Sequence, residues 1–397
     1  MSYANDCRSA NMTPFGPSSG FGKGLHNARY GYKACIAQQA ELNQLPAGPA
    51  TTTMKKRPTI KDIARETGVH ASTVSRALDP DSQKRNLLSK EVIERIRETA
   101  ERLGYRPNRQ AAGLRISRTW SIGVMIPDIT NTLFPPILRG IESILEPRGY
   151  TSIIVNTDNI PERENRLLDV LHERGVDGII NGAAHRIDPK MAQVAATGTP
   201  IVTLNRKAED PSIPYVINDE HEGIRLAFKH LFDLGHRRIA SVAGPQSFST
   251  GQMRLETFRE TCAEFGIPET EAPIIAAESY NEAEGERCAG RILDGTPSVT
   301  AILCANDRLA VGALRALRSR GLDCPRDISV TGFNDMPFLE FLSFGLTTVR
   351  IKQFEAGQTS ARILLKLIED ADHDAPMATV LPVELVARES CAPPRGN

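Results

Sequence analysis

The 397-residue chain has few cysteines, few aromatic residues and no long apolar run. Its seven cysteines are an odd number, lie scattered and form no CxxC pair. This pattern argues against a disulfide framework and a structural zinc site, and it fits a reducing cytoplasm. No apolar run approaches the ~18 residues of a membrane helix, and no signal peptide is visible at the N-terminus. We therefore expect a cytoplasmic protein with no membrane partner.

The motifs of common enzyme classes are also missing. The chain has no phosphate-binding Walker loop, no dinucleotide-binding fingerprint and no G-x-S-x-G turn. Its eight histidines are dispersed, and His236 in LGHRRIA is better explained as a residue that caps or packs after a helix. The sequence therefore predicts no enzyme activity, no catalytic residue, no metal site and no cofactor.

Charge is balanced over the whole chain but segregated along it. Residues 54–119 hold 16 Lys and Arg against 8 Asp and Glu, whereas residues 120–397 hold 28 against 38. A basic N-terminal segment followed by an acidic remainder of the chain is typical of a nucleic-acid-binding protein with a separate second function. A merely solvated basic face remains an alternative, although it explains the segregation less well.

Residues 1–53 are rich in Gly, Pro, Ser, Asn and Gln and show no periodic pattern, which predicts a disordered extension. Met54 opens the segment MKKRPTIKDIARETG. One interpretation is that translation of the natural protein starts at Met54 and that residues 1–53 are not translated.

Residues 59–78 read TIKDIARETGVHASTVSRAL. Thr59 is a good helix N-cap with Asp62 in the capping-box position, and Gly68 suits the left-handed residue that ends a helix. A second short helix, rich in small polar residues and carrying Arg76, follows. Two short helices joined by a glycine-bearing turn indicate a helix-turn-helix. A helical hairpin that only packs against the rest of the chain would show the same pattern.

Two further segments follow this motif. The apolar stripe between Ser89 and Gly104 predicts a third helix that closes a small core. Residues 106–118 then carry four arginines and one lone leucine, Leu114. Within this segment, residues 108–115 are long enough for about two helical turns, a length that is largely unfolded by itself in water.

From Trp120 onward, short runs of β-branched residues alternate with helical patterns. This alternation predicts parallel, doubly wound sheets with helices on both faces, and such sheets bind ligands beyond the carboxyl ends of their strands. Polar residues stand at several predicted strand ends, among them Asp128, Asn156, Asn181, Asn205, Asn218, Asn306 and Asn334. A body of this length is large for one sheet, so we expect two similar lobes with a cleft between them.

Nine segments in order resemble the lactose-repressor (LacI/GalR) family of bacterial transcription regulators over roughly residues 58–390: TIKDIARETGV, STVSRAL, LGYRPN, SIGVMIPDITN, VDGII, LGHRRIA, CANDRLAVGALRAL, DISVTGFND and LTTV. The resemblance implies an N-terminal all-α helix-turn-helix domain followed by an α/β periplasmic-binding-protein-like body of two doubly wound lobes. The expected boundaries are 58–105 for the helix-turn-helix domain, 106–118 for a hinge helix, 120–217 plus 346–376 for the first lobe, and 218–345 plus 377–390 for the second lobe.

The resemblance also implies a homodimer on palindromic double-stranded operator DNA, with the second helix of each motif in a major groove. Base-reading positions match Ala71, Ser72 and Arg76. Arg76 can make a bidentate contact to guanine, worth about 1–3 kcal/mol of discrimination, whereas Ala71 can only pack on a thymine methyl group. The family usually has Ser or Thr where this chain has His70, which predicts a weaker cap on the second helix.

Other positions match contacts to the DNA backbone and to the minor groove. Phosphate contacts match Thr59, Thr73, Ser75 and Asn86, although Thr73 and Ser75 are explained equally well as helix surface. Residues 106–118 resemble the family's hinge helix, in which Leu114 is a wedge between base steps of the minor groove. Asn108 and Arg115 are the other DNA contacts predicted there.

The effector-contacting positions of the family match Phe134, Asn205, Arg206, Arg254, Asn306, Asp307 and Asn334. Phe134 is explained nearly as well as helix core. The family often has Asp where this chain has Asn205 and Asn334, and amides beside two arginines make the pocket less acidic. This change favours a sugar acid or phosphorylated sugar over a neutral sugar. Ordinary variation with no meaning for charge is an equally good explanation.

These observations predict a sequence-specific transcription regulator, a repressor whose operator affinity is controlled allosterically by a small sugar-like effector bound between two lobes. The rival hypothesis is a DNA-binding or architectural protein whose body has lost ligand sensing. The chain ends in SCAPPRGN without a leucine heptad, so a tetramer built on such a tail is not expected.

Overall fold

The computed structural model describes residues 58–78, 88–105, 118–296, 298–337, 339, 345–369 and 376–395. The chain forms two compact units that divide after Pro107. The predictions for residues 1–53, for Asn86 and for the hinge residues Asn108, Leu114 and Arg115 lie outside the described residues. No helix in the described ranges is long and apolar enough to cross a membrane.

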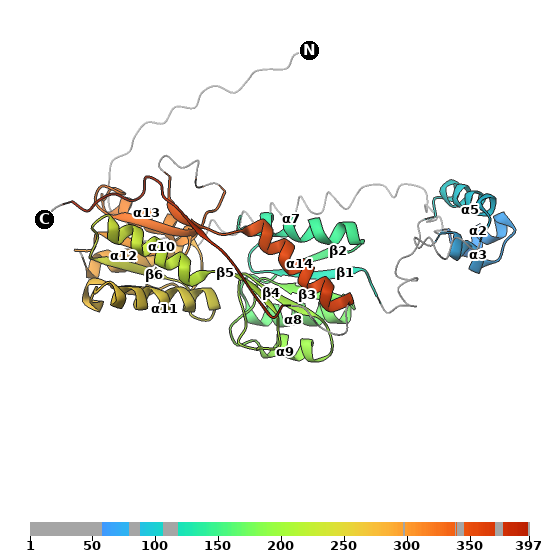
Figure 1. Ribbon diagram of the computed structural model, residues 1–397, viewed down its shortest axis with the longest axis horizontal. Helices are drawn as coiled ribbons and strands as arrows, with labels where there is room; N and C mark the ends of the chain where they lie inside the picture. Colours follow the sequence, from blue (N-terminus) through green and yellow to red (C-terminus); the bar gives the residue numbers. More distant parts are fainter. Residues whose placement is uncertain are drawn as a thin grey trace, which may run out of the picture. The chain divides into compact units, whose positions relative to one another are not determined.

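The first unit is built from three helices (Figure 1), α2 (Ile60–Thr67), α3 (Ala71–Ala77) and α5 (Lys90–Leu103). Its small core consists of the buried side chains of Ile63, Val74, Ala77, Ile96 and Ala100, to which all three helices contribute. The unit therefore has the predicted helix-turn-helix followed by a third helix.

The ends of these helices follow from local sequence. The Asp62 carboxylate accepts hydrogen bonds from the backbone N–H and the hydroxyl of Thr59, at 2.9 and 2.7 Å, which ties the first turn of α2 together. Gly68 and Gly104 end α2 and α5 with φ angles of 69° and 68°. Glycine enters this left-handed region without the steric cost that a Cβ atom brings. The predicted helix boundaries at Thr59, Gly68, Ser89 and Gly104 are confirmed.

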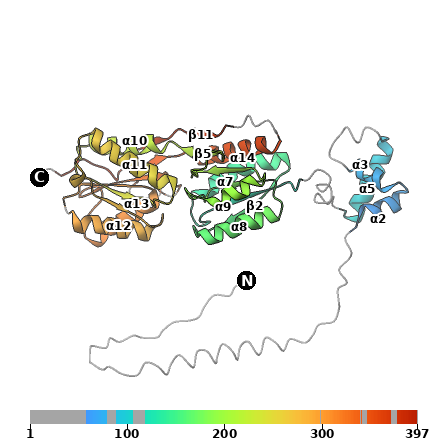
Figure 2. The same cartoon turned by 90° about the horizontal axis from the view of Figure 1, so that it is seen from below.

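The first lobe of the second unit is a six-stranded parallel sheet in the order β11-β5-β4-β3-β1-β2. Figures 1 and 2 show helices α7 and α14 on one face of this sheet and α8 and α9 on the other. Its elements are β1 (Ser121–Ile126), α7 (Phe134–Leu145), the short 3-10 helix η2 (Glu146–Arg148), β2 (Thr151–Asn156), α8 (Pro161–Glu173), β3 (Gly178–Asn181), α9 (Pro189–Ala196), β4 (Ile201–Leu204), β5 (Tyr215–Asn218), α14 (Gln353–Glu369) and β11 (Ala378–Leu381). Successive residues of β1 serve both faces, because Val124 packs with α7 and α14 while Met125 packs with α8 and α9.

The second lobe repeats this plan with strand order β12-β10-β9-β8-β6-β7, in which β12 is antiparallel to β10. Helices α10 and α11 cover one face, and α12 and α13 cover the other (Figure 2). Its elements are α10 (Glu220–Asp233), β6 (Ile239–Ala243), α11 (Ser249–Glu264), the short 3-10 helix η3 (Glu269–Glu271), β7 (Ile274–Ala276), α12 (Glu282–Gly295), β8 (Ala301–Cys304), α13 (Asp307–Ser319), β9 (Ser329–Asn334), β10 (Thr347–Arg350) and β12 (Glu384–Val386). The predicted body of two doubly wound lobes is confirmed.

The C-terminal segments are divided between the lobes differently from the prediction. The segment 346–376 was expected in the first lobe, but its strand β10 belongs to the second sheet. The segment 377–390 was expected in the second lobe, but its strand β11 belongs to the first sheet. The physical reason is that the chain changes lobe after each of these strands, and a short apolar run does not reveal which sheet it will join.

Two glycines bring α12 and α13 close together. A Cβ atom on Gly285 would lie 2.2 Å from the Leu309 carbonyl oxygen, and one on Gly312 would lie 2.1 Å from the Glu282 carbonyl oxygen. Neither position can accept a side chain without backbone movement. This contact fixes the first turn of α13, which carries several polar residues at the carboxyl end of β8.

Candidate functional site

The exposed surface of α3 carries the side chains that were predicted to read bases. Ser72 and Arg76 are exposed and stand four residues apart, so they share one helix face. Val74 and Ala77 are buried on the opposite side against α2 and α5. The other predicted DNA contacts in the described part of this unit are exposed or half-buried: Thr59, Ala71, Thr73 and Ser75.

His70 caps α3 by a route that the sequence did not suggest. Its Nδ1 atom accepts a hydrogen bond from the Ser72 backbone N–H at 3.3 Å and lies 2.8 Å from the Ser72 hydroxyl oxygen. The ring nitrogen therefore replaces the usual hydroxyl or carboxylate oxygen, over a long hydrogen bond. It also gives the Ser72 hydroxyl a partner within the protein. Arg76 is then the best-placed side chain on this face for a new polar contact.

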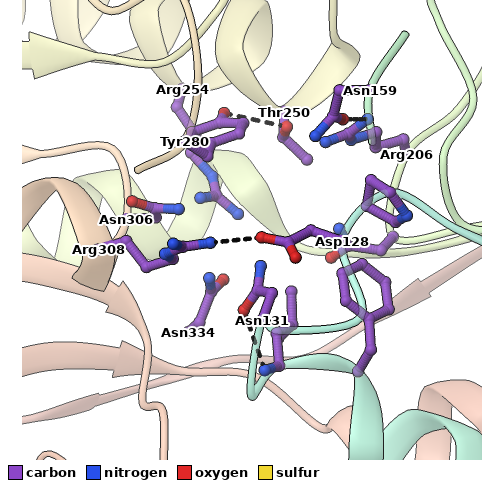
Figure 3. A pocket seen from close by; sticks show the side chains of 14 residues that line it. Asp128, Asn131, Asn159, Arg206, Thr250, Arg254, Tyr280, Asn306, Arg308 and Asn334 are labelled. Atoms are coloured by element: carbon purple, nitrogen blue, oxygen red, sulfur yellow. Dashed lines mark hydrogen bonds and ion pairs between the residues drawn. The ribbon is translucent and has the colours of Figure 1, made fainter. Parts of the chain in front are cut away.

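A cavity of about 40 Å³ lies between the two lobes of the second unit (Figure 3). Its lining comes from the carboxyl ends of strands in both sheets and from adjoining segments: Pro127, Asp128, Asn131, Leu133, Phe134, Asn159, Asn205, Arg206, Thr250, Arg254, Tyr280, Asn306, Arg308 and Asn334. Space of this size admits a few water molecules but not a monosaccharide. A larger ligand must therefore enter when the lobes are further apart.

Six of the seven predicted effector-binding residues line this cavity, namely Phe134, Asn205, Arg206, Arg254, Asn306 and Asn334. The seventh, Asp307, does not. Its side chain is fully buried and accepts hydrogen bonds from the Thr348 hydroxyl at 2.6 Å and the Met336 backbone N–H at 2.9 Å. Burial raises the pKa of Asp307 to about 7. Asp307 thus holds the segment after β9 against β10, and it makes no contact with the cavity.

Arg206 is a buried cation without a carboxylate at ion-pair distance in the described structure. Its Nη1 donates to the Asn159 side-chain oxygen at 3.0 Å and to the Ala183 carbonyl oxygen at 3.2 Å. The guanidinium group stacks 3.6 Å from the ring centre of Phe248, which belongs to the second lobe. Burial lowers the pKa of Arg206 to about 10, and its Nε atom has no hydrogen-bond partner in the described structure.

Arg254, on α11, is held from several directions. Its Nε donates to Glu220 at 2.5 Å, its Nη1 donates to the Ala305 carbonyl oxygen at 2.5 Å, and its guanidinium group stacks on the ring of Phe333. Glu220 is buried, and burial raises the pKa of its carboxyl group in spite of Arg254. This buried pair orients the Arg254 guanidinium at the cavity wall.

Arg308 connects the two lobes across the cavity (Figure 3). Its Nη1 lies 2.8 Å from the Asp128 carboxylate, which follows β1 in the first lobe. Its Nε and Nη2 bind Glu282 of α12 at 2.7 and 2.9 Å. Burial opposes ionisation of Asp128, but hydrogen bonds from Thr130 and Arg308 outweigh it and lower the pKa of Asp128.

Several lining residues were missed: Asp128, Asn131, Asn159 and Tyr280 lie in loops, and Thr250 and Arg308 lie in the first turns of α11 and α13. Thr250 and Tyr280 are joined by a hydrogen bond of 3.1 Å at the second-lobe wall, and Asn159 holds Arg206 at the first-lobe wall. Asp128 carried the one usable signal, since it was a polar residue at a predicted strand end. No periodic pattern marks the other positions as neighbours of the cavity.

Two family models match this chain, one in each of its two units. Residues 59–108 match the model of "Bacterial regulatory proteins, lacI family", and residues 228–391 match that of a periplasmic binding protein-like domain. A ribose operon repressor of Halalkalibacterium halodurans is 31% identical over 84% of this chain and 96% of its own length. The chain belongs to the LacI family of bacterial regulatory proteins. The predicted family and the prediction of a regulator instead of an enzyme are thereby confirmed.

Solved structures of the LacI family resemble this chain as well. A lac repressor dimer bound to operator and the anti-inducer ONPF has a TM-score of 0.75 and 28% identity, covering 85% of this chain and all of that one. A LacI-family regulator of Enterococcus faecium with bound ribose has a TM-score of 0.61 and 32% identity, covering 69% of this chain and 99% of that one. The relatives therefore include proteins with each of the two ligand types, operator DNA and a sugar.

Proposed function

We propose that this protein is a transcriptional repressor that binds palindromic operator DNA as a homodimer, with an operator affinity controlled by a sugar or sugar acid. The observation that best supports this proposal is the polar cavity, which is lined by residues of both lobes and bridged by the Asp128–Arg308 ion pair. A ligand held between two lobes favours one lobe arrangement over another, and only such differential binding can shift a conformational equilibrium.

The DNA-binding part of this proposal rests on the first unit. Its α3 helix presents Ser72 and Arg76 on one exposed face, and the segment 54–119 has twice as many basic as acidic residues. Basic residues supply the salt-dependent attraction to phosphates that all DNA binding needs. Among the LacI-family relatives, a lac repressor dimer bound to operator matches 85% of this chain.

The lining of the cavity supports an acidic effector. Three arginines face one aspartate, and the Asp128 charge is already paired with Arg308. Arg206 has no carboxylate at ion-pair distance in the described structure, and Asn205 and Asn334 are neutral amides. Guanidinium groups bind carboxylates and phosphates in bidentate fashion. We therefore favour a sugar acid or phosphorylated sugar, while the polar amides also suit the hydroxyl groups of a neutral sugar such as the ribose bound to the Enterococcus relative.

Calorimetric titration of the full chain tests this assignment. Ribose, glucose, gluconate and ribose 5-phosphate serve as probes against the wild type and Arg206→Gln. We expect gluconate or ribose 5-phosphate to bind more tightly than the neutral sugars, and Arg206→Gln to reduce anion binding by at least tenfold. Arg166→Gln is the matched control, because Arg166 is an exposed arginine of α8 in the same lobe. Tight binding of neutral sugars alone would refute the acidic effector.

A further inference from the structure

Four buried polar atoms without a hydrogen-bond partner in the described structure belong to Arg206 and to three first-lobe residues that interact with one another and with it electrostatically. They are Glu164 Oε2 on α8, His185 Nε2 and Asp188 Oδ2 between β3 and α9, and Arg206 Nε itself. Buried polar atoms are nearly always hydrogen-bonded, so a group of four in one place requires an explanation. The described residues contain no three His, Cys, Asp or Glu side chains spaced to hold a metal ion. A resident metal is therefore not that explanation.

Glu164 and His185 form one pair in this group, and Asp188 is the other carboxyl group beside Glu164. Glu164 Oε2 lies 3.5 Å from His185 Nε2, and the two side chains are 2% and 18% exposed. The other oxygen of Glu164 accepts a hydrogen bond of 3.2 Å from the Asn181 amide. One proton placed between Glu164 and His185 would give both orphaned atoms a partner after a small side-chain movement.

The surroundings favour keeping that proton on the carboxyl group. Burial and the charge of Asp188 raise the pKa of Glu164 to about 7. Burial and the charge of Arg206 lower the pKa of His185, which Asp188 opposes. The separation would permit an ion pair, but both shifts favour the neutral forms. The charged or titratable groups that face the pair are Asp188 beside it, Arg206 after β4 and, beyond Arg206, Tyr280 of the second lobe.

The charges of the group balance when one proton is present. Arg206 is positive, Asp188 is negative, and the Glu164–His185 pair with its single proton is neutral. Loss of the proton leaves one uncompensated negative charge next to Arg206. In a buried setting the balanced state is strongly preferred, because unpaired charges are poorly solvated there.

We propose that Glu164, His185 and Asp188 form a proton-binding site behind Arg206, and that this proton sets the net charge that Arg206 presents to the cavity. With the proton bound, the positive charge of Arg206 is available to an anionic group of a ligand. Without it, Glu164 competes with that ligand. Proton binding and anion binding therefore strengthen each other, and by linkage the effect is reciprocal.

His185 also connects the proton site to the second lobe. The His185 ring lies 5.0 Å from the Phe248 ring, centre to centre, and Phe248 is the residue on which Arg206 stacks. A change of charge on His185 or Glu164 therefore alters the electrostatic environment of a contact between the lobes. The coupling to effector binding rests on the proposed function, whereas the proton site itself does not.

The proton site is tested without any ligand by the thermal unfolding of the full chain between pH 5 and pH 8. Because the folded pKa of Glu164 lies above its ordinary value, its contribution to stability is lost as pH rises toward and through 7. Glu164→Gln does not titrate, so its unfolding midpoint should rise relative to wild type by roughly 5 °C from pH 5 to pH 8. Glu162→Gln, an exposed change on the same turn of α8, should run parallel to wild type. A parallel profile for Glu164→Gln as well would overturn the proton site.

The coupling is tested by calorimetry with gluconate and ribose in two buffers of different ionisation enthalpy at pH 7.5. Binding of gluconate should be accompanied by uptake of a fraction of a proton by the protein, whereas binding of ribose should cause no uptake. Glu164→Gln should abolish the uptake that accompanies gluconate binding. The gluconate affinity of the wild type should fall by up to roughly tenfold from pH 7 to pH 8. Uptake that persists in Glu164→Gln, or its absence in the wild type, contradicts the coupling. If neither probe binds at any pH, the proposed effector class is wrong, and the unfolding profiles alone decide the proton site.

Discussion

The ion pair between Asp128 and Arg308 is a contact whose loss should loosen the closed arrangement of the lobes. Asp128→Asn is the appropriate change because it keeps the local turn. Both bonds from Thr130, at 2.9 and 2.6 Å, go to Asp128 Oδ1, which an asparagine retains, whereas Arg308 binds Oδ2. The substitution thus replaces one charged acceptor by an amide N–H₂ group that faces a guanidinium cation.

The expected magnitude follows from the geometry of the pair. A hydrogen bond to a charged group contributes about 1.5–3 kcal/mol, and an exposed ion pair contributes about 0–1 kcal/mol. The side chains of Arg308 and Asp128 are 16% and 28% exposed, so a value of about 1.5 kcal/mol is appropriate. This value changes the ratio of closed to open forms by roughly tenfold. Other hydrogen bonds between the lobes remain, for example from the Lys207 backbone N–H to the Ser249 hydroxyl oxygen at 2.9 Å.

Förster transfer between dyes on α8 and α12, one in each lobe, measures this ratio in the full chain without ligand. We expect a longer mean dye separation in Asp128→Asn. Glu282→Gln is the matched control, because it weakens the other ion pair of Arg308, which lies wholly within the second lobe. An unchanged separation in Asp128→Asn, or an equal change in Glu282→Gln, refutes the assignment of Asp128–Arg308 as a bridge between the lobes.

Two further predictions concern single residues. Asp307 has a folded pKa of about 7, well above its ordinary value, so its favourable contribution is present at low pH and is lost as pH rises through 7. Asp307→Asn should therefore destabilise the chain at pH 5, and this deficit should shrink by an amount on the order of 3 kcal/mol at pH 8 in denaturant titrations; a constant deficit contradicts the buried position between Met336 and Thr348. His70 caps α3 through a long bond of 3.3 Å to the Ser72 N–H, so His70→Ser should strengthen the cap by about 1 kcal/mol. Hydrogen exchange of the α3 amides should then slow by about fivefold, and faster exchange would show that the histidine is the better cap.

The parts of the fold that local chemistry determines were predictable from the sequence. Thr59 with Asp62, and Gly68, set the ends of α2 within a few residues of chain. The β-branched runs after Trp120 gave the strands of both sheets for the same reason. The assignment of β10 and β11 to their sheets was wrong, because pairing between distant strands depends on the whole lobe and leaves no mark in a four-residue run.

In the candidate site too, some residue positions follow from local sequence and others depend on contacts between distant parts of the chain. Asn306 and Asp307 are adjacent, and both were predicted to contact an effector, but only Asn306 lines the cavity. Asp307 begins α13, and the absence of a side chain at Gly332 leaves the space that its carboxylate fills, since a Cβ there would lie 2.3 Å from Asp307 Oδ1. Tyr280 reaches the cavity from a segment without periodicity. Such relations arise from packing and not from a motif.

We infer that a ligand in the cavity between the lobes controls DNA binding by the first unit. Fluorescence anisotropy of the full chain on DNA from the region upstream of its own gene, with and without gluconate, ribose 5-phosphate and ribose, measures this control directly. We expect specific binding whose affinity changes by at least fivefold with one of these ligands. Arg206→Gln should lose that change while its DNA binding stays otherwise intact. Specific DNA binding that no ligand of a broad sugar and sugar-acid panel alters would contradict this inference and would favour a body that no longer senses a ligand.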